Sequence, residues 1–251
     1  MLETILLSIT QGITEFLPVS SSAHLILISQ YLNFNNENLV FDISLHIGSL
    51  LAVILFFNKE IINFLQNKSL FIKIIISSLP TMLFGFLLIK LNLIGYFRNT
   101  YVISCTTIIF GLLLYFSDKS RMDRSINHHF SLRDAIYIGF FQILSLIPGV
   151  SRSGITITCA RFLKFDRINS AKISFLLSIP TLMAISAYNI FKIIELKNFQ
   201  LAIQNYWAIF FSFVFSLLTL KILLKFLKKF SYIFFVIYRI FLGAVIILYV
   251  R

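Results

Sequence analysis

Two polar stretches interrupt an otherwise apolar sequence: EFLPVSSSAH at residues 15–24 and SLIPGVSRSG at residues 145–154. In each, a proline (Pro18 or Pro148) is followed by serines, which favours a loop over a continuous helix. The chain is 58% hydrophobic and only 13% charged, whereas soluble domains usually carry about a quarter charged residues. A soluble globule of this size could not bury so much apolar surface, but a bilayer can solvate it. The sequence therefore predicts an integral membrane protein.

The apolar segments beside the two polar stretches are too short to cross a bilayer. Segments 25–32 and 135–147 would reach roughly 12 Å and roughly 20 Å as helices, and the hydrocarbon core is about 30 Å thick. Polar backbone at membrane depth is tolerated only where it is buried in protein or lines a wet cavity. We therefore predict two re-entrant helix–loop–helix hairpins, over 1–32 and 135–163.

Six other apolar stretches are long enough to cross a bilayer, or nearly so. A spanning helix needs about 20 residues, with a range of about 17–25. The predicted spans are 41–57, 70–91, 101–117, 171–192, 206–224 and 232–250. With the two hairpins, they predict an all-α polytopic membrane protein.

The two halves of the chain resemble each other at a nearly constant spacing. Pro18 and Pro148 are 130 residues apart, ISLHIGSLLAVI and ISFLLSIPTLMAI begin 130 apart, and FGLLLY and LGAVII begin 132 apart. Such self-similarity indicates a duplication. We infer one membrane domain, 1–251, made of repeats near 1–125 and 126–251. Each repeat has one hairpin and three spans, and because three is odd the second repeat is inverted, with the site at the repeat interface.

The basic residues predict which side faces the cytoplasm. The net charge is +12, and the loops on one side of the predicted topology hold fifteen Lys and Arg. The other side holds five: Lys90, Arg98, Lys192, Lys197 and Arg251. The positive-inside rule makes the richer side cytoplasmic, and we attribute the excess charge to topology and anionic lipid, not to nucleic acid. Arg152, in the second polar stretch, and Arg239, in mid-span, remain; we expect Arg239 to pair or to snorkel.

The second polar stretch has the chemistry of an anion-binding loop. Ser151, Ser153 and Thr156 offer hydroxyls, and the segment after the loop can begin a helix whose N-terminal amides favour an anion. Arg152 adds a forked, permanently charged donor that suits phosphate. The alternative is a soft Ser/Gly turn with an arginine that reaches water. Ionisable residues at membrane depth are costly, and this favours the functional interpretation.

The first polar stretch has residues suited to catalysis. Glu15 would repel phosphate, so it either holds a divalent cation that bridges to the substrate or acts as a general base. Gln11 lies four residues earlier, on the same helix face, and can supply an amide oxygen or a hydrogen bond. Ser21 is a candidate nucleophile, next to the hydroxyl of Ser20. His24 is a candidate base, acid or alternative nucleophile.

Four further residues are less specific. Asp42 and His46 follow the first hairpin and fit either a functional role or a hydrogen-bonded core. Cys105 and Cys159 lie in or beside apolar stretches, and their spacing indicates neither a metal site nor a disulfide.

QGITEFLPVSSSAH and PGVSRSGIT resemble the two signature motifs of the undecaprenyl-diphosphate phosphatases, also called the bacitracin resistance protein family. FDISLHIGSLLAVILFF and SFLLSIPTLMA resemble the segments that follow in each half, so the resemblance covers essentially the whole chain. It implies a hydrolase of the bacterial inner membrane that converts undecaprenyl diphosphate to undecaprenyl phosphate and inorganic phosphate. That reaction recycles the lipid carrier for peptidoglycan and other envelope polymers and confers resistance to bacitracin.

The resemblance also implies a divalent cation, Mg²⁺ or Ca²⁺, and a site that faces the periplasm. Position 11 is Gln, where many members have Glu; the family motif admits either. The resemblance carries the acidic motif over to Gln11 and Glu15, the serine–histidine part to Ser20, Ser21 and His24, and the phosphate-binding part to Ser151, Arg152 and Thr156. Together with the residue chemistry above, we predict that the catalytic residues are Glu15, Ser21, His24 and Arg152, that the phosphate-binding residues are Ser20, Ser151, Arg152, Ser153 and Thr156, and that the metal ligands are Glu15 and Gln11.

A transporter or flippase of a phosphorylated lipid or anion is the main alternative, because inverted repeats with broken helices are typical of transporters. The Glu–Ser–His cluster opposite an arginine favours an enzyme, since transport needs neither a nucleophile nor a base. The nucleophile stays open among Ser21, His24 and water, and a homodimer is compatible with the sequence.

Overall fold

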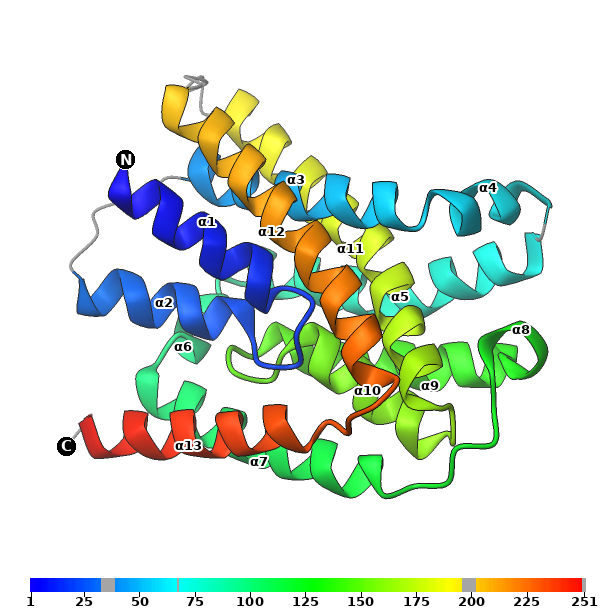
Figure 1. The fold of residues 1–251 in the computed structure, drawn as a ribbon. Coiled ribbons are helices and arrows are strands. Elements are labelled where there is room, and N and C mark those ends of the chain that lie inside the picture. Colours follow the sequence, from blue (N-terminus) through cyan, green and yellow to red (C-terminus); the bar gives the residue numbers. More distant parts are fainter. Residues whose placement is uncertain (33–38, 67, 196–201, 250–251) are drawn as a thin grey trace.

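The computed structural model describes residues 1–32, 39–66, 68–195 and 202–249, and every regular element in these ranges is helical (Figure 1). Within these ranges, one isolated β-bridge pairs Arg124 with Phe165. In chain order the elements are α1 Leu2–Thr14, α2 Ser21–Tyr31, α3 Leu39–Phe56, α4 Asn58–Gln66, α5 Lys68–Lys90, α6 Ile94–Phe97, α7 Thr100–Asp118, α8 Ile126–His129, α9 Leu132–Ile143, η1 Leu144–Leu146, α10 Arg152–Phe162, α11 Arg167–Glu195, α12 Ile203–Leu227 and α13 Ile233–Tyr249.

The predicted spans are long apolar helices in the structure. Five helices of the described ranges are long and apolar enough to cross a bilayer, namely α3, α5, α7, α11 and α12. The sixth predicted span is α13, an apolar helix of 17 residues. α11 begins earlier than the predicted span, at Arg167, because Asp166 caps its first turn by accepting from the Asn169 amide at 2.8 Å. The all-α polytopic membrane fold is confirmed.

A helical hairpin occupies each of the two regions predicted to be re-entrant. Loop 15–20 joins α1 to α2, and η1 with loop 147–151 joins α9 to α10. Figure 1 shows that the hairpins point in opposite directions: α1–α2 begins and ends on the side of the chain termini, whereas α9–α10 begins near α8. Their tips meet inside the molecule, where Ser153 Oγ of α10 donates to the Leu17 carbonyl at 2.7 Å.

The two hairpin loops end in the same backbone conformation. Ser20 and Ser151 are the N-caps of α2 and α10, with φ of 75° and 72°, a region that L-residues with a side chain rarely adopt. The Ser20 hydroxyl accepts from the Ala23 amide at 3.4 Å, and the Ser151 hydroxyl accepts from the Gly154 amide at 3.1 Å. This likeness supports the duplication, and the inverted repeat itself stays a prediction.

Each hairpin packs closely on a spanning helix through a glycine. A Cβ at Gly12 of α1 would lie 2.9 Å from the Ser212 carbonyl of α12. A Cβ at Gly139 of α9 would lie 2.7 Å from the Ser77 carbonyl of α5. Small residues let helix backbones approach closely in membranes, where packing replaces the hydrophobic driving force.

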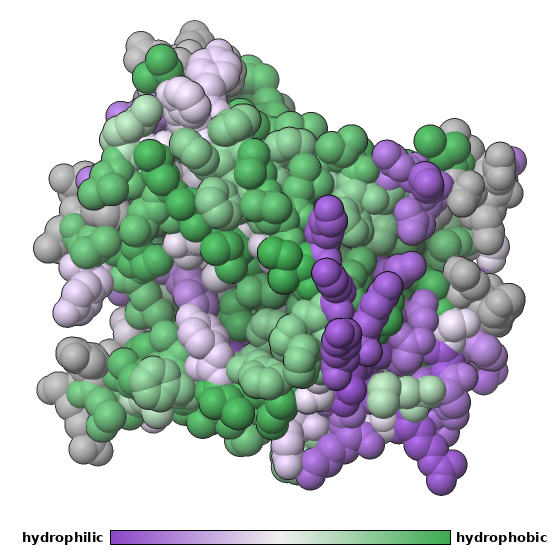
Figure 2. Space-filling model, viewed as in Figure 1, coloured by the Kyte–Doolittle hydropathy of each residue, from purple (hydrophilic) through white to green (hydrophobic). Residues whose placement is uncertain are grey.

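The basic connections predicted to be cytoplasmic are joined at one end of the molecule. Asp118, at the end of α7, accepts from Arg167 Nε at 2.8 Å and from the Tyr232 amide at 3.1 Å. Arg161 Nε lies 3.4 Å from the same carboxylate. Figure 2 shows hydrophilic side chains gathered toward the lower right of the molecule and a broad hydrophobic surface over the rest of that face. Lys197 and Arg251, assigned to the opposite side, lie outside the described residues.

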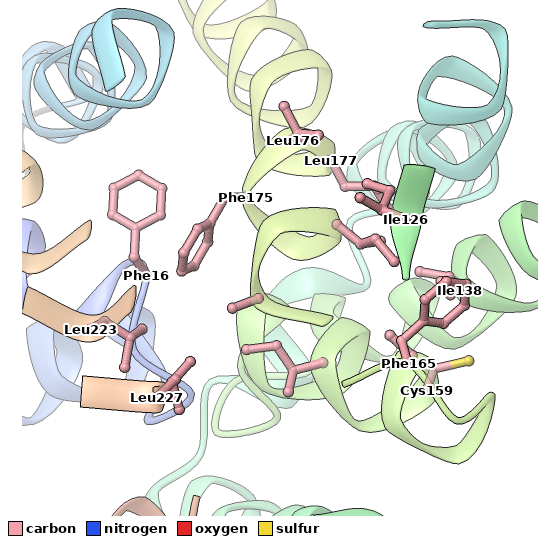
Figure 3. Packing of buried hydrophobic residues seen from close by; sticks show 14 of the residues in the cluster. Phe16, Ile126, Ile138, Cys159, Phe165, Phe175, Leu176, Leu177, Leu223 and Leu227 are labelled. Atoms are coloured by element: carbon pink, nitrogen blue, oxygen red, sulfur yellow. The ribbon is translucent and has the colours of Figure 1, made fainter. Parts of the chain in front are cut away.

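The main apolar core lies beside the hairpin tips and draws on both halves of the chain. In it, the ring of Phe16 meets that of Phe175 of α11 edge to face, with centroids 5.6 Å apart (Figure 3). These two residues directly follow Glu15 and Ser174 in the chain. Dense packing of the rings therefore fixes the backbone from which both polar side chains project.

Gly48→Ala is expected to destabilise the fold. A Cβ at Gly48 of α3 would lie 2.5 Å from the Ile209 carbonyl of α12, so the two helices would have to separate. Overpacking of this kind costs about 1–3 kcal/mol, and we expect a lower melting temperature in detergent. Gly95→Ala is the matched control, because a Cβ there meets no atom within 4 Å. A Gly48→Ala protein as stable as this control would contradict the close contact of α3 with α12.

Candidate active site

A buried arginine of α13 holds the two hairpin loops together. The Arg239 guanidinium donates to the Pro18 carbonyl of the first loop at 3.1 Å, and to the Gly149 and Val150 carbonyls of the second at 2.8 and 3.1 Å. Its Nε donates to the Thr107 carbonyl of α7 at 3.1 Å. The side chain is 0% exposed. Arg239 does not reach the surface, so the expectation that it snorkels is wrong; it is paired instead, and its partners in the described structure are backbone carbonyls.

The hydroxyls predicted to bind phosphate are bonded within and between the loops. Ser20 and Ser151 cap their helices, and Ser153 donates to the first loop. Thr156 Oγ1 donates to Ser174 Oγ of α11 at 2.8 Å. All of them are buried. In this structure these hydroxyls shape the loops, and a direct contact with phosphate stays a prediction.

Glu15 is the centre of the cluster that the fold assembles. Its carboxylate oxygen Oε2 accepts from Ser21 Oγ at 2.7 Å and from Gln11 Nε2 at 3.0 Å. The other oxygen, Oε1, accepts from Arg152 Nη2 at 3.1 Å, which makes an ion pair between the two hairpins. The Glu15 side chain is 6% exposed. Three other residues singled out from the sequence therefore bond to the carboxylate of Glu15.

Positive groups surround this carboxylate on several sides. Helices α2 and α10, of 11 residues each, both begin at the loops, so the positive ends of their dipoles lie at the site. Arg152 is bonded to the carboxylate, and Arg239 binds the loop backbone nearby. The site can therefore hold more negative charge than Glu15 alone supplies.

A cavity of about 730 Å³ reaches this cluster. Its lining includes Gln11 and Ser21 of the first hairpin and His46 of α3, whose Nδ1 lies 3.2 Å from Gln11 Nε2. Arg98 and Lys192, two exposed cations, line the same cavity. The cavity thus joins basic side chains of the surface to the Ser21 hydroxyl, an arrangement that attracts anions. Its lining also includes Asp42.

His24 is bonded to partners other than Ser21 and Glu15. Its Nδ1 lies 2.7 Å from the Ser20 carbonyl oxygen, and its Nε2 is hydrogen-bonded to the Tyr238 hydroxyl of α13. The hydroxyl–base pair in this structure is therefore Ser21 with Glu15, and His24 stands beside it on the first turn of α2.

The donor set fits a divalent cation only in part. The described ranges contain no group of three or more His, Cys, Asp or Glu side chains that could hold a metal ion. Gln11 Oε1 is buried without a hydrogen-bond partner in this structure, next to the Glu15 carboxylate that its own Nε2 contacts. Carboxylate and amide oxygens are ligands that Mg²⁺ and Ca²⁺ accept. The pair fits a cation that takes its other ligands from phosphate and water.

Sequence reasoning missed two parts of the site. Arg239 was visible as an ionisable residue at membrane depth, which is the signal that marks it, but its carbonyl partners depend on the tertiary fold. Tyr238 carries no such signal, because its partner His24 lies 214 positions away.

The chain is similar to known proteins over nearly its whole length. A family model described as bacitracin resistance protein BacA matches residues 4–245. A Pelagibacter ubique protein named undecaprenyl-diphosphatase is 43% identical over 252 residues, which cover 98% of this chain and 96% of that protein. Proteins of the same name from Chromohalobacter salexigens and a Jannaschia species are 40% and 37% identical, covering 99% and 96% of this chain and 98% and 96% of their own lengths.

Arg239→Lys is expected to loosen both loops at once. An ammonium group keeps the charge but cannot span carbonyls on two loops and α7, and each buried acceptor left unpaired costs about 1–3 kcal/mol. We expect a lower melting temperature and at least a tenfold loss of turnover. Arg133→Lys makes the same exchange at an exposed arginine of α9 and should change neither property. An Arg239→Lys protein with normal turnover would contradict the role of the guanidinium in placing the loops.

Proposed function

Because this chain belongs to the family of the bacitracin resistance protein BacA, we propose that the cavity that reaches Ser21 is where it hydrolyses undecaprenyl diphosphate. The chain is a multi-pass membrane hydrolase that converts this lipid to undecaprenyl phosphate and inorganic phosphate. The reaction recycles the lipid carrier of cell-wall synthesis, and the family name implies resistance to bacitracin. The single observation that supports the site is the Ser21–Glu15 hydrogen bond beside the Arg152 guanidinium.

Ser21 is the nucleophile in the mechanism that this geometry supports best. Its hydroxyl already donates to Glu15, so the carboxylate can take the proton as Oγ attacks the terminal phosphorus. The new O–P bond forms as the anhydride P–O bond breaks, and undecaprenyl phosphate leaves with the bonding electron pair. Water then attacks the phosphoserine, inorganic phosphate is released, and Ser21 recovers its proton from Glu15.

In this mechanism Arg152 binds first the Glu15 carboxylate and then the phosphoryl group. In this structure its guanidinium donates to Glu15 Oε1 and to the Ser174 carbonyl. When Glu15 takes the proton from Ser21, the carboxylate becomes neutral and negative charge appears on the phosphoryl group. The guanidinium then stabilises that charge with the donors that the carboxylate no longer needs.

The alternative nucleophiles are His24 and water. Both ring nitrogens of His24 are bonded in the described structure, so the ring would have to give up a partner before it could attack phosphorus. Ser21 needs no such rearrangement, because its oxygen keeps free lone pairs while its proton points to Glu15. This difference favours Ser21.

We propose that a divalent cation, Mg²⁺ or Ca²⁺, binds with the substrate through Glu15 and Gln11. The unpartnered Gln11 Oε1 supports this role. When bound, such a cation neutralises charge on the phosphate oxygens. Ser21 and Arg152 also bond to Glu15 and would hold its carboxylate in place beside the cation.

We propose that the cavity faces the periplasm of the bacterial inner membrane. Arg98 and Lys192, which line it, belong to the side with few basic residues, and the positive-inside rule places the richer side in the cytoplasm. The polyprenyl tail lies in bilayer lipid against the apolar outer surface. All residues of the cluster come from one chain, so catalysis by a monomer is expected, and a homodimer would not have to complete the site.

Ser21→Ala and Glu15→Gln are expected to abolish phosphate release from undecaprenyl diphosphate. We expect losses of up to about 10⁶-fold for the nucleophile and about 10²–10⁴-fold for the base. Ser22→Ala is the matched control for the first variant, because this neighbouring hydroxyl contacts Ser20 and not Glu15; Glu60→Gln on α4 is the control for the second.

Rapid quenching with substrate labelled in the terminal phosphate then identifies the nucleophile by peptide mapping. Phosphoserine at position 21 is the expected product. Phosphohistidine at position 24 would overturn the proposed role of Ser21, and release of phosphate by Ser21→Ala at the wild-type rate would do so as well.

Substitution of Gln11 should change the cation requirement. Gln11→Glu adds a charged oxygen ligand and is expected to lower the cation concentration for half-maximal turnover several-fold; Gln11→Leu should raise it. The measurement is phosphate release after chelation, titrated separately with Mg²⁺ and Ca²⁺. Equal half-maximal concentrations in all three proteins would exclude Gln11 as a ligand.

A further inference from the structure

The two ring nitrogens of His24 have different kinds of partner. Nδ1 lies 2.7 Å from the Ser20 carbonyl oxygen. A carbonyl oxygen only accepts hydrogen bonds, so Nδ1 carries the proton in the neutral ring. The other nitrogen, Nε2, then has a free lone pair, and it is the nitrogen that can exchange a proton during a reaction.

The partner of Nε2 is the hydroxyl of Tyr238. The two rings are stacked nearly parallel, with an interplanar angle of 8° and centroids 5.7 Å apart. A phenol hydroxyl can donate to neutral imidazole and accept from the imidazolium. Tyr238 can therefore bind Nε2 in both protonation states.

The position of Tyr238 is fixed by its neighbour in the chain. Arg239 is fully buried and donates to carbonyls of both hairpin loops, so this turn of α13 cannot shift without moving the loops. Tyr238 itself is 41% exposed, and in the described structure its hydroxyl bonds to His24. Because Arg239 fixes this turn of α13, the Tyr238–His24 hydrogen bond also restrains the ring of His24.

Helix α2 is buried less than its counterpart α10. Of the residues of α2, Ala23 is the one that is fully buried, whereas α10, its counterpart in the second hairpin, is buried from Ser153 to Arg161. Without the Tyr238 hydroxyl, the His24 ring would be held by a hydrogen bond at Nδ1 alone. A ring held at one point can swing, and a smaller share of molecules then has Nε2 correctly directed.

We propose that Tyr238 is the positioning residue for His24 in the phosphatase reaction. Its hydroxyl keeps Nε2 in one direction while His24 takes a proton from the water that attacks the phosphoserine and passes it to the released phosphate. This inference rests on the proposed function and adds this proton transfer to the step in which Glu15 returns its proton to Ser21.

Tyr238→Phe tests the proposal, because it removes the hydroxyl and keeps the ring. We expect kcat for undecaprenyl diphosphate to fall about tenfold to a hundredfold, as for other groups that orient a functional histidine, with KM nearly unchanged. A second measurement is the rate at which diethyl pyrocarbonate modifies His24, read by peptide mass spectrometry. This reagent attacks an unprotonated ring nitrogen, so we expect His24 to react several-fold faster once Nε2 loses its partner.

Two controls separate these effects from general damage. Tyr206→Phe removes the same hydroxyl from an exposed tyrosine of α12 and should change neither kcat nor the modification of His24. His129, which is exposed, gives an internal reference for the reagent in each protein.

An unchanged rate of His24 modification in Tyr238→Phe would overturn the proposal, and so would faster modification with an unchanged kcat. An increase in KM alone would assign Tyr238 to substrate binding and would also overturn it. If the wild-type protein released no phosphate, the proposed function would fail instead, and the modification rates would still decide whether Tyr238 covers Nε2.

Discussion

Polar backbone inside a membrane must find its hydrogen bonds within the protein, and the Arg239 guanidinium supplies them to the two hairpin loops. The carbonyls of Pro18, Gly149 and Val150 lie where the helices are interrupted, and one planar, permanently charged group accommodates all three. Because the same group binds both loops, it also sets the distance between them. Glu15 and Arg152, which follow from the two loops, meet as a consequence.

The site depends on a difference between two similar loops. With Pro18 aligned to Pro148 and the caps Ser20 and Ser151 aligned to each other, Gly149 is an insertion. In this alignment Ser145 stands where the first half has Glu15, and Arg152 stands where it has Ser21. A strict copy would replace Ser145 by a second glutamate and Arg152 by a serine, and would leave Glu15 without its cationic partner. The observed loops instead supply one acid, Glu15, and one permanently charged cation, Arg152. The molecule therefore has one Glu–Ser cluster, and an arginine faces it.

The sequence predicts the membrane architecture well because length and polarity decide it. Spans follow from apolar runs, and the hairpins follow from polar residues between runs too short to cross. The cluster of Gln11, Glu15, Ser21 and Arg152 could also be predicted, since ionisable residues at membrane depth are rare. The partners could not. Ser153 and Thr156 carry hydroxyls of the kind that bind phosphate, yet these hydroxyls donate to the Leu17 carbonyl and to Ser174 Oγ. Both acceptors are brought close only by the tertiary fold.

The ion pair between Glu15 and Arg152 is better explained by chemistry than by stability. Removing two charges from water costs several kcal/mol per ion, and well-packed apolar residues in place of a buried pair are often as stable or more so. The pair therefore indicates a use for the charges. Counted with Arg239, the loops carry one net positive charge at their meeting point. A diphosphate brings more than one negative charge, so the bound state has an excess of negative charge that a divalent cation would neutralise. This charge balance supports the proposed cation, which would enter with the substrate.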